Sequence, residues 1–234
     1  NAGTVTVNGT FNGSGTLTNW AGGDITITST GAMHRSADVT NGYSGMDDTG
    51  STTFTVAAGG EYYGYISSTA GDFYNYYPAI TRVLGTTTDG AGTMAIQGTF
   101  FNGDATGTYG GTVLITGGTV TQTHSSTKYF RNIKGTITIA GNGSQAGLLD
   151  TDEIVQNGSS WFVGGTLHVN TGGSIDCESN FQNHYQNTSV PTINVAGGTI
   201  TCVEFKNGND NKVGGVVNVS AGSITHTGTF YNYD

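Results

Sequence analysis

Gly215–Asn232, with the sequence GVVNVSAGSITHTGTFYN, has the pattern of short strands followed by an asparagine. Val217 and Val219 alternate with polar neighbours, and the alternation continues after a small turn at Ala221-Gly222. Apolar residues at every second position, interrupted by glycine, indicate β-strands and not a helix. The stretch therefore predicts β-structure in which alternate side chains face a common core.

The same pattern recurs through the whole chain. Gly92–Asn102 aligns with Gly222–Asn232 without a gap, as do residues 9–19 and 31–41. Nine copies end in a hydrophobic residue, any residue and then an asparagine, and these asparagines are Asn19, Asn41, Asn75, Asn102, Asn132, Asn157, Asn183, Asn207 and Asn232. A self-similar unit that returns every 20–35 residues or so is typical of stacked structural repeats.

The repeat predicts an all-β fold, a single-stranded parallel β-helix (β-solenoid) of about nine coils that is uncapped at both ends. Residues 1–234 form a single domain in this interpretation, with loop insertions near 42–52, 61–72, 84–92 and 146–164. Coils stacked at a rise of about 4.8 Å place matching residues in columns. Three apolar columns, which begin at Val7, Phe11 and Leu17, are expected to form the core.

The nine asparagines are expected to lie one above another at a bend of the coil, where asparagine tolerates a left-handed φ. Stacked side-chain amides can form a hydrogen-bonded ladder, as they do in cross-β structures. We therefore predict an asparagine ladder along the whole solenoid.

Charged residues are scarce, and their balance is acidic. Lys and Arg number 7 against 16 Asp and Glu, which gives a net charge of −9, and charged residues make up only 10% of the chain. Nucleic acid and anionic membranes call for clustered basic residues, so both are disfavoured as partners. No apolar run approaches the roughly 20 residues of a membrane span. The chain starts at Asn1 without a methionine, which indicates processing or excision from a longer protein.

The nine copies and their repeated asparagine resemble secreted parallel β-helix surface proteins of the filamentous-haemagglutinin and adhesin type. The architecture is also similar to that of pectate-lyase-like enzymes and phage tailspikes, and more weakly to that of the amyloid-like sheath proteins of methanogenic archaea. The resemblance covers all nine copies and implies an extracellular or cell-surface location. It brings no catalytic motif with it.

Uncapped ends predict self-assembly. A terminal coil without a cap exposes unpaired N–H and C=O groups and an open apolar core. Head-to-tail contacts generate filaments or large hoops. We expect a structural homopolymer, a fibre, sheath or surface layer with head-to-tail and lateral contacts. The alternative is a passenger fragment of an adhesin that binds glycan or protein. A carbohydrate-active enzyme is disfavoured because acids and bases do not group in a copy-matched pattern, and no catalytic residue or cofactor is expected.

Two cysteines and a histidine share one offset in the last three copies. Cys177, Cys202 and His226 each follow a glycine by four residues, so they are expected to stack in an inward-facing column. The two cysteines could form a disulfide, because adjacent coils lie within the permitted Cα separation. A pair of buried free thiols is the alternative. A Cys-Cys-His metal site lacks a fourth ligand.

Aromatic and acidic residues supply further candidates. Six tyrosines are predicted to make lateral contacts or bind a ligand, except for those that fill the third coil's core: Tyr62, Tyr63, Tyr65, Tyr74, Tyr76 and Tyr77. Asp150, Asp152 and Glu153 form a weak calcium candidate, against the alternative of a solvated acidic turn. Six sequons could accept glycans in a secreted protein, although chance explains most of them: Asn8, Asn12, Asn142, Asn157, Asn187 and Asn218.

Overall fold

The structure is a computed structural model that describes residues 3–42, 52–67, 69–104, 110–123, 128–158, 163–185, 190–208 and 213–233, with the side chain of Tyr185 left aside. Within these ranges every regular element is a β-strand, which confirms the all-β prediction. None of the described segments forms a helix of the length and apolarity that a membrane crossing requires.

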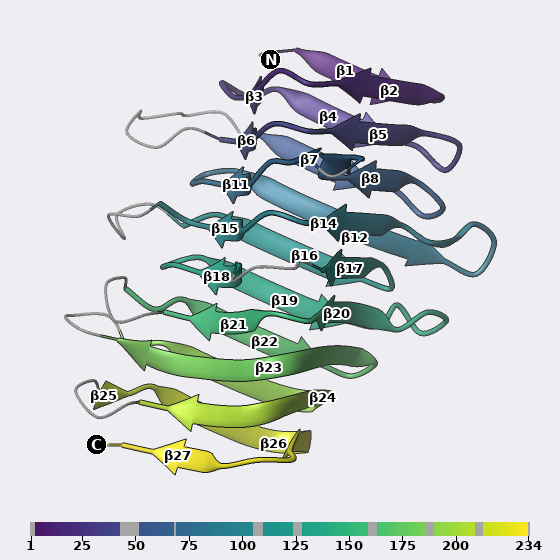
Figure 1. Cartoon of the computed structure of the whole chain (residues 1–234). Helices are drawn as coiled ribbons and strands as arrows, with labels where there is room; N and C mark the ends of the chain where they lie inside the picture. Colours follow the sequence, from purple (N-terminus) through teal and green to yellow (C-terminus); the bar gives the residue numbers. More distant parts are fainter. Residues whose placement is uncertain are drawn as a thin grey trace.

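The chain winds as a parallel β-solenoid whose coils stack along one axis, with the two ends of the chain at opposite ends of the stack (Figure 1). Each coil contributes strands to three ladders, and the pairing within the ladders is parallel and in register, apart from β-bulges in the last three coils. Within a ladder, a strand therefore pairs with the equivalent strand of the next coil. This arrangement is the one that the repeat predicted.

The first ladder contains nine strands or strand segments within the described ranges: β1 (Thr4–Val7), β4 (Asp24–Ile27), β7 (Thr53–Val56), β12 (Ile80–Thr86), β16 (Thr112–Thr116), β19 (Thr136–Ala140), β22 (Thr166–Asn170) and the first parts of β24 (Thr192–Asn207) and β26 (Val216–His226). The second ladder is formed by β2 (Thr10–Gly13), β5 (Ala32–Arg35), β8 (Glu61–Tyr63), β14 (Thr93–Ile96), β17 (Thr119–Gln122), β20 (Gly147–Thr151), the first part of β23 (Gly173–Tyr185), and later parts of β24 and β26.

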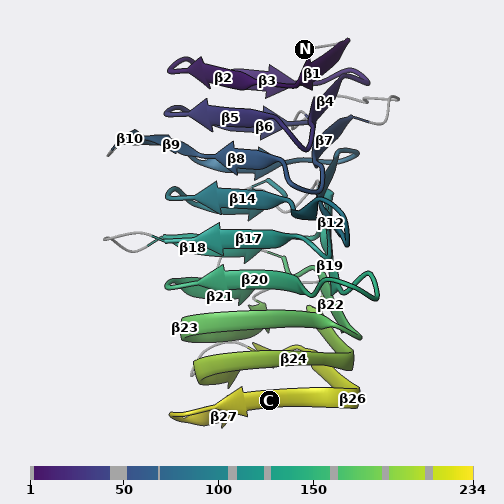
Figure 2. The same cartoon turned by 90° about the vertical axis from the view of Figure 1, so that its right-hand side faces the viewer.

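The third ladder carries the asparagines. It consists of β3 (Leu17–Asn19), β6 (Val39–Asn41), β11 (Phe73–Asn75), β15 (Phe100–Asn102), β18 (Tyr129–Asn132), β21 (Ile154–Asn157), the ends of β23 and β24, and β27 (Phe230–Asn232). Figure 2 shows the ladders from the side, with the strands of successive coils stacked in rows.

The core lies inside the coils and contains the three predicted columns, together with a further column that was not predicted and that includes Ile25, Phe54 and Ile137. Period-two alternation turns one side chain of each pair inward, so residues such as Ile27, Met33 and Val39 are at most 1% exposed. The third coil is filled by three aromatic rings: Phe54, Tyr62 and Phe73 meet edge to face with centroids 5.2–5.7 Å apart. Parallel stacking then continues the third column from Phe73 onward.

Hairpins account for two of the predicted insertions. Residues 84–92 contain the turn between β12 and β13 (Gly90–Ala91), and residues 61–72 contain β9 (Tyr65–Ile66) and β10 (Thr69–Ala70), which pair with each other. Most of 42–52 lies outside the described residues. The insertion at 146–164 was predicted too broadly, because 147–157 contribute the regular strands β20 and β21. A further short strand, β25 (Val213–Gly214), pairs antiparallel with the end of β23.

Candidate functional site

The asparagine ladder runs without interruption from Asn19 to Asn232. Each side-chain amide donates from Nδ2 to Oδ1 of the asparagine in the next coil, at 2.8–3.0 Å. Most of them also donate to a backbone carbonyl two coils further on, as Asn75 does to the carbonyl of Thr112 at 3.0 Å. Both amide hydrogens are thereby used inside the protein, and the donors all point toward the C-terminal coil.

The bend at the ladder differs from the prediction. No described ladder asparagine has a positive φ, and each ends a strand of the third ladder. In four coils the left-handed conformation falls on the following glycine: Gly42, Gly103, Gly158 and Gly208 have φ values of 84°, 123°, 85° and 91°. Glycine reaches this region without a steric penalty. The asparagine therefore contributes its side-chain amide to the ladder, and the glycine after it adopts the left-handed conformation of the turn.

Glycines that precede the first-ladder strands make room for the asparagine amides. A Cβ at Gly111 would lie 2.4 Å from Nδ2 of Asn75, and a Cβ at Gly135 would lie 2.2 Å from Nδ2 of Asn102. A ladder amide therefore packs directly against the backbone of a later coil. These glycines recur just before strands of the first ladder, a signal in the sequence that was not recognised as part of the ladder.

A second ladder of side chains lies on the outside of the third face. The rings of Tyr74 and Phe101 stack with centroids 4.9 Å apart and planes at 1°. The Arg131 guanidinium lies 5.6 Å from the Phe101 ring centre and donates from Nε to Gln156 at 2.8 Å, and Gln156 donates in turn to Gln182 at 2.8 Å. We call these five residues the outer stripe. Stacking and hydrogen bonds between these side chains restrict their conformations, so this part of the outer face is ordered.

The six predicted tyrosines do not form one surface. Tyr62 is 1% exposed and belongs to the core, as expected for some members of the set. Burial is also the main reason that its pKa is raised. Tyr63 and Tyr65 meet edge to face beside the β9–β10 hairpin, with ring centroids 5.8 Å apart.

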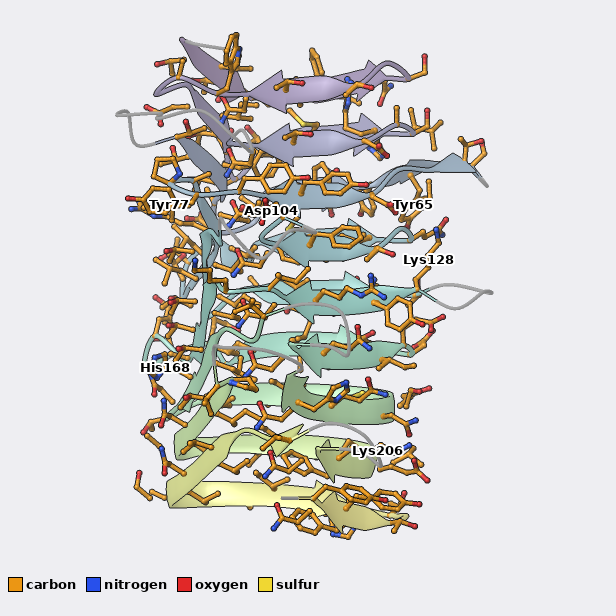
Figure 3. The ribbon with its side chains drawn as sticks, turned by 90° about the vertical axis from the view of Figure 1, so that its left-hand side faces the viewer. Tyr65, Tyr77, Asp104, Lys128, His168 and Lys206 are labelled. Atoms are coloured by element: carbon orange, nitrogen blue, oxygen red, sulfur yellow. The ribbon has the colours of Figure 1, made fainter. Side chains whose placement is uncertain are left out.

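The other three tyrosines lie on a different side of the solenoid. Tyr65 and Tyr77 appear on opposite sides of the stack in Figure 3. Tyr74 stacks on Tyr76 with centroids 5.7 Å apart, and Tyr77 is 56% exposed. Burial, with smaller contributions from Asp104 and Asp38, raises the pKa of Tyr76 to about 12. The exposed tyrosines therefore belong to two separate aromatic surfaces on different sides of the solenoid.

The two cysteines lie directly opposite each other on β23 and β24, in the predicted inward-facing column. Cys177 and Cys202 are 1% and 2% exposed, and both are free thiols in the structure. Cys177 donates to the carbonyl of Glu153 at 3.3 Å. His226 continues the column in the last coil, where it is exposed.

Thiol titration with DTNB separates the disulfide from the free pair. Burial, followed by the neighbouring Cys177, raises the pKa of Cys202 to about 12, so this thiol stays protonated and unreactive at pH 8. We expect no reaction from the native protein and two reacting thiols per chain after denaturation. Absence of reactive thiols in the denatured protein, with their return after reduction, would show a disulfide.

The acidic candidates are divided between a strand and the turn that follows it. Asp150 belongs to the strand β20 and faces Asp176 on the next coil, while Asp152 and Glu153 occupy the turn that follows. Burial first, and then Asp176 and Asp152, raise the pKa of the Asp150 carboxyl. Among the residues that the structure describes, no three His, Cys, Asp or Glu side chains come together as metal ligands. The calcium prediction therefore finds no support here, and neither does the Cys-Cys-His alternative.

The sequons differ in accessibility. Asn8, Asn12, Asn142 and Asn218 are exposed, whereas Asn187 lies outside the described residues. Asn157 is 1% exposed, and its amide donates to Asn183 and to the carbonyl of Thr192. A glycan on Asn157 would require the ladder to open, so this sequon is a wrong candidate in the folded chain.

Arg35 occupies an inward position that the sequence did not single out. It is 5% exposed, its guanidinium lies 5.8 Å from the Phe11 ring centre, and it donates to the carbonyl of Gly15. A Cβ at Gly13, the matching position of the first coil, would overlap this guanidinium. Arg35 thus fills the core space that Gly13 leaves empty.

The last coil directs backbone groups away from the stack. Val216 at the start of β26 donates to the carbonyl of Pro191 in the preceding coil, at 2.9 Å. Because neighbouring residues of a strand direct their backbone groups to opposite sides, Val217 and Val219 direct theirs away from β24. Phe230 in the same coil is 51% exposed, whereas Phe205 above it is fully buried.

The first coil presents the complementary edge. The carbonyl of Val7 accepts a hydrogen bond from Thr28 of the second coil at 3.0 Å, so Thr4 and Thr6 direct their backbone groups away from β4. Phe11 in this coil is 41% exposed. Within the described ranges no strand pairs with the outer edges of β1, β2 and β3, or with those of β26 and β27.

Comparisons with family models, with curated proteins and with solved structures return no match for this chain. The structure defines its class, a parallel β-solenoid with an internal asparagine ladder.

Proposed function

We propose that this chain is a structural protein that assembles head to tail into an extracellular fibre, sheath or surface layer. The observation that carries the proposal is the pair of complementary backbone edges on the terminal coils. At one end of the stack, Val217 and Val219 of β26 direct their backbone N–H and C=O groups away from the neighbouring coil. At the other end, Thr4 and Thr6 of β1 do the same.

The side-chain columns match across such a junction. With the register that relates all other coils, Val217 and Val219 would meet Val5 and Val7, and Phe230 would meet Leu17. The contact would bury apolar groups that are half exposed in the single chain, Phe230 and Val219 at 51% each among them. Burial of this apolar area and new parallel backbone bonds would together favour association.

The asparagine ladder also fits the junction. Asn232 accepts from Asn207 at 2.8 Å, and it ends the ladder at the coil that would face the following subunit. One ladder could therefore run through many subunits. The outer stripe, apart from the buried Gln156, is a candidate for the lateral contacts of such fibres, because its stacked side chains lose little freedom on association.

Proline at an outer edge tests the junction directly. Thr6→Pro removes an N–H that points away from β4, and Val219→Pro removes one that points away from β24, so neither change breaks a bond inside the subunit. We expect the unmodified chain to form filaments with a subunit repeat of about 43 Å, which is nine rises of about 4.8 Å. Each proline variant alone should stay monomeric, and a mixture of the two should form a one-to-one dimer through the edges that remain intact.

Thr6→Ala is the matched control, because it removes the same side chain but keeps the N–H, and it should still assemble. Electron microscopy and light scattering measure the products. The subunits carry a net charge of −9 each, so added salt should lengthen the filaments by screening their repulsion. A monodisperse monomer of the unmodified chain, or equal assembly of all variants, would contradict the proposal.

A further inference from the structure

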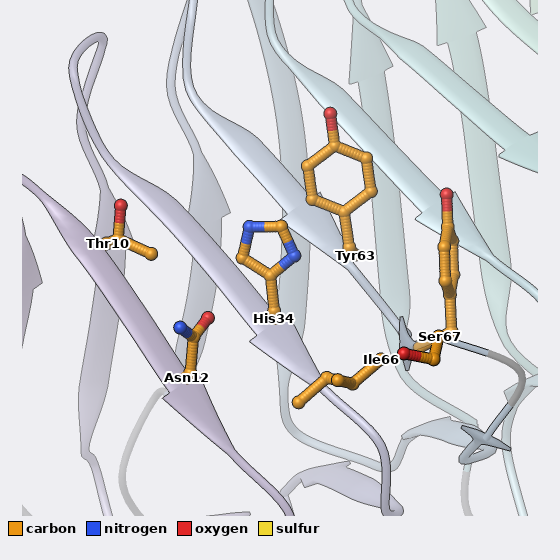
Figure 4. A pocket seen from close by; sticks show the side chains of 7 residues that line it. Thr10, Asn12, His34, Tyr63, Ile66 and Ser67 are labelled. Carbon is orange, nitrogen blue, oxygen red and sulfur yellow. The ribbon is translucent and has the colours of Figure 1, made fainter.

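A hollow of about 440 Å³ lies on the outer surface of the first three coils. Its floor consists of outward-facing side chains of β2, β5 and β8, and the hairpin that begins with β9 supplies its wall (Figure 4). We call it the outer-face hollow, and its lining residues are Thr10, Asn12, His34, Tyr63, Tyr65, Ile66 and Ser67. Its volume is within the range of about 300–1,000 Å³ that small-molecule sites occupy.

Aromatic rings in two orientations line this hollow. His34 and Tyr63 stack with centroids 4.6 Å apart and planes at 13°, so one ring supports the other. Tyr65 stands across Tyr63 at 82°. Because the first two rings lie on adjacent coils and the third lies on the hairpin, the backbone fixes their relative positions. A ligand therefore meets preformed ring faces and edges.

The polar groups of the hollow are hydroxyls, an amide and the imidazole of His34. Thr10, Ser67 and the two tyrosines offer hydroxyl groups that can both donate and accept, and Asn12 offers a donor and an acceptor. Glu61 lies close to Tyr63: after burial, its charge and its hydrogen bond raise the pKa of Tyr63. The nearby carboxylate and the net charge of −9 oppose an anionic ligand.

We propose that the outer-face hollow binds a neutral saccharide, a short chain of hexose or N-acetylhexosamine units. Sugar rings combine apolar C–H faces, which pack on aromatic rings, with hydroxyl groups that exchange hydrogen bonds with hydroxyl and amide side chains. The lining provides both kinds of partner within one concave surface, and it lacks the Lys or Arg side chain that an acidic sugar would require. The site is distinct from the outer stripe and does not depend on assembly.

Calorimetry with defined trisaccharides tests this site. The probes are cellotriose, maltotriose, mannotriose and chitotriose, with trigalacturonate as the acidic comparison and with protein made in a host that does not glycosylate Asn12. We expect at least one neutral probe to bind with a Kd below about 10 mM and trigalacturonate to bind at least tenfold more weakly. Tyr65→Ala and Asn12→Ala should each weaken the neutral probe on the order of tenfold, since each removes one side of the site.

Two variants outside the outer-face hollow serve as controls for saccharide binding. Gln145→Ala alters a second hollow, which has no aromatic ring in its lining, and it should leave binding unchanged; this hollow is lined by Gly141, Gly143, Ser144, Gln145, Ala146, Thr171 and Gly172. Tyr231→Ala removes a stacked ring on another face and should also have no effect.

Asn12 is exposed and outside the core, so its variant should keep the fold even if Tyr65→Ala disturbs the hairpin. No binding by any neutral probe, stronger binding of trigalacturonate, or unchanged affinity in Asn12→Ala would overturn the proposal. Filament formation, measured on Tyr65→Ala and Gln145→Ala because both residues lie away from the terminal coils, should be unaffected.

Discussion

Asn102→Ala should lower the free energy of unfolding by about 3 to 5 kcal/mol, because it leaves several buried polar groups without partners. Asn102 is fully buried, accepts from Asn75 at 2.8 Å, and donates to Asn132 at 2.8 Å and to the carbonyl of Thr136 at 3.3 Å. Truncation removes all three hydrogen bonds, and a methyl group replaces none of them. Urea unfolding followed by circular dichroism measures the change.

Asn232→Ala is the control for this prediction. Asn232 is exposed and accepts one ladder bond, from Asn207, so its loss should cost no more than about 1 kcal/mol in the monomer. Gly135→Ala tests the ladder from the other side, since its Cβ would lie 2.2 Å from the Asn102 amide nitrogen. It should destabilise the protein without removing any side-chain hydrogen-bonding group. Equal stability of Asn102→Ala and Asn232→Ala would show that the ladder contributes little.

Phe100→Ala is expected to cost about 3 to 5 kcal/mol, the usual range for a large aromatic residue lost from a packed core. Phe100 is 1% exposed and stacks on Phe73 and Phe130, with ring centroids 5.3 and 4.5 Å away and planes within 6° of parallel. Its removal leaves a cavity in the middle of the third column. Because each coil contacts mainly its two neighbours, protection from hydrogen exchange should fall first in the coils of these three residues.

Phe101→Ala provides a comparison in the next residue. Phe101 faces outward in the same strand and stacks on Tyr74, 4.9 Å away, so its loss should cost only about 1 kcal/mol. Denaturant unfolding of both variants gives the difference. If the outward residue proved as costly as the inward one, the assignment of the core to the inside of the coils would have to be abandoned.

The columns and the ladder could be predicted from sequence because they depend on parity and spacing alone. A strand exposes alternate residues to one side, so Phe73, Phe100 and Phe130 had to share a side once their copies were aligned. The asparagine two residues later then had to share that side as well. Parallel in-register pairing turns each repeated position into a stack, and the structure confirms the predicted third column from Leu17 to Phe230.

Other features depend on contacts between coils, which the repeat does not encode. The left-handed bend falls on a glycine such as Gly103 because the asparagine before it is held in a strand by its amide. Arg35 takes an inward position only because Gly13 in the coil beside it leaves space. The outer-face hollow joins Asn12, His34 and Tyr63 from three coils with a hairpin that occurs once, so no motif in the sequence identifies it.

The hydrogen bonds of the asparagine ladder all run in one direction, so the molecule is polar along the solenoid axis. All described ladder amides donate toward the C-terminal coil, and inverting one asparagine would place two donors or two acceptors face to face. Subunits joined through this ladder must all point the same way, so a fibre of them would be a polar track with two chemically different tips. Such tips would grow at unequal rates, and a molecule that moves or binds along the fibre could distinguish one direction from the other.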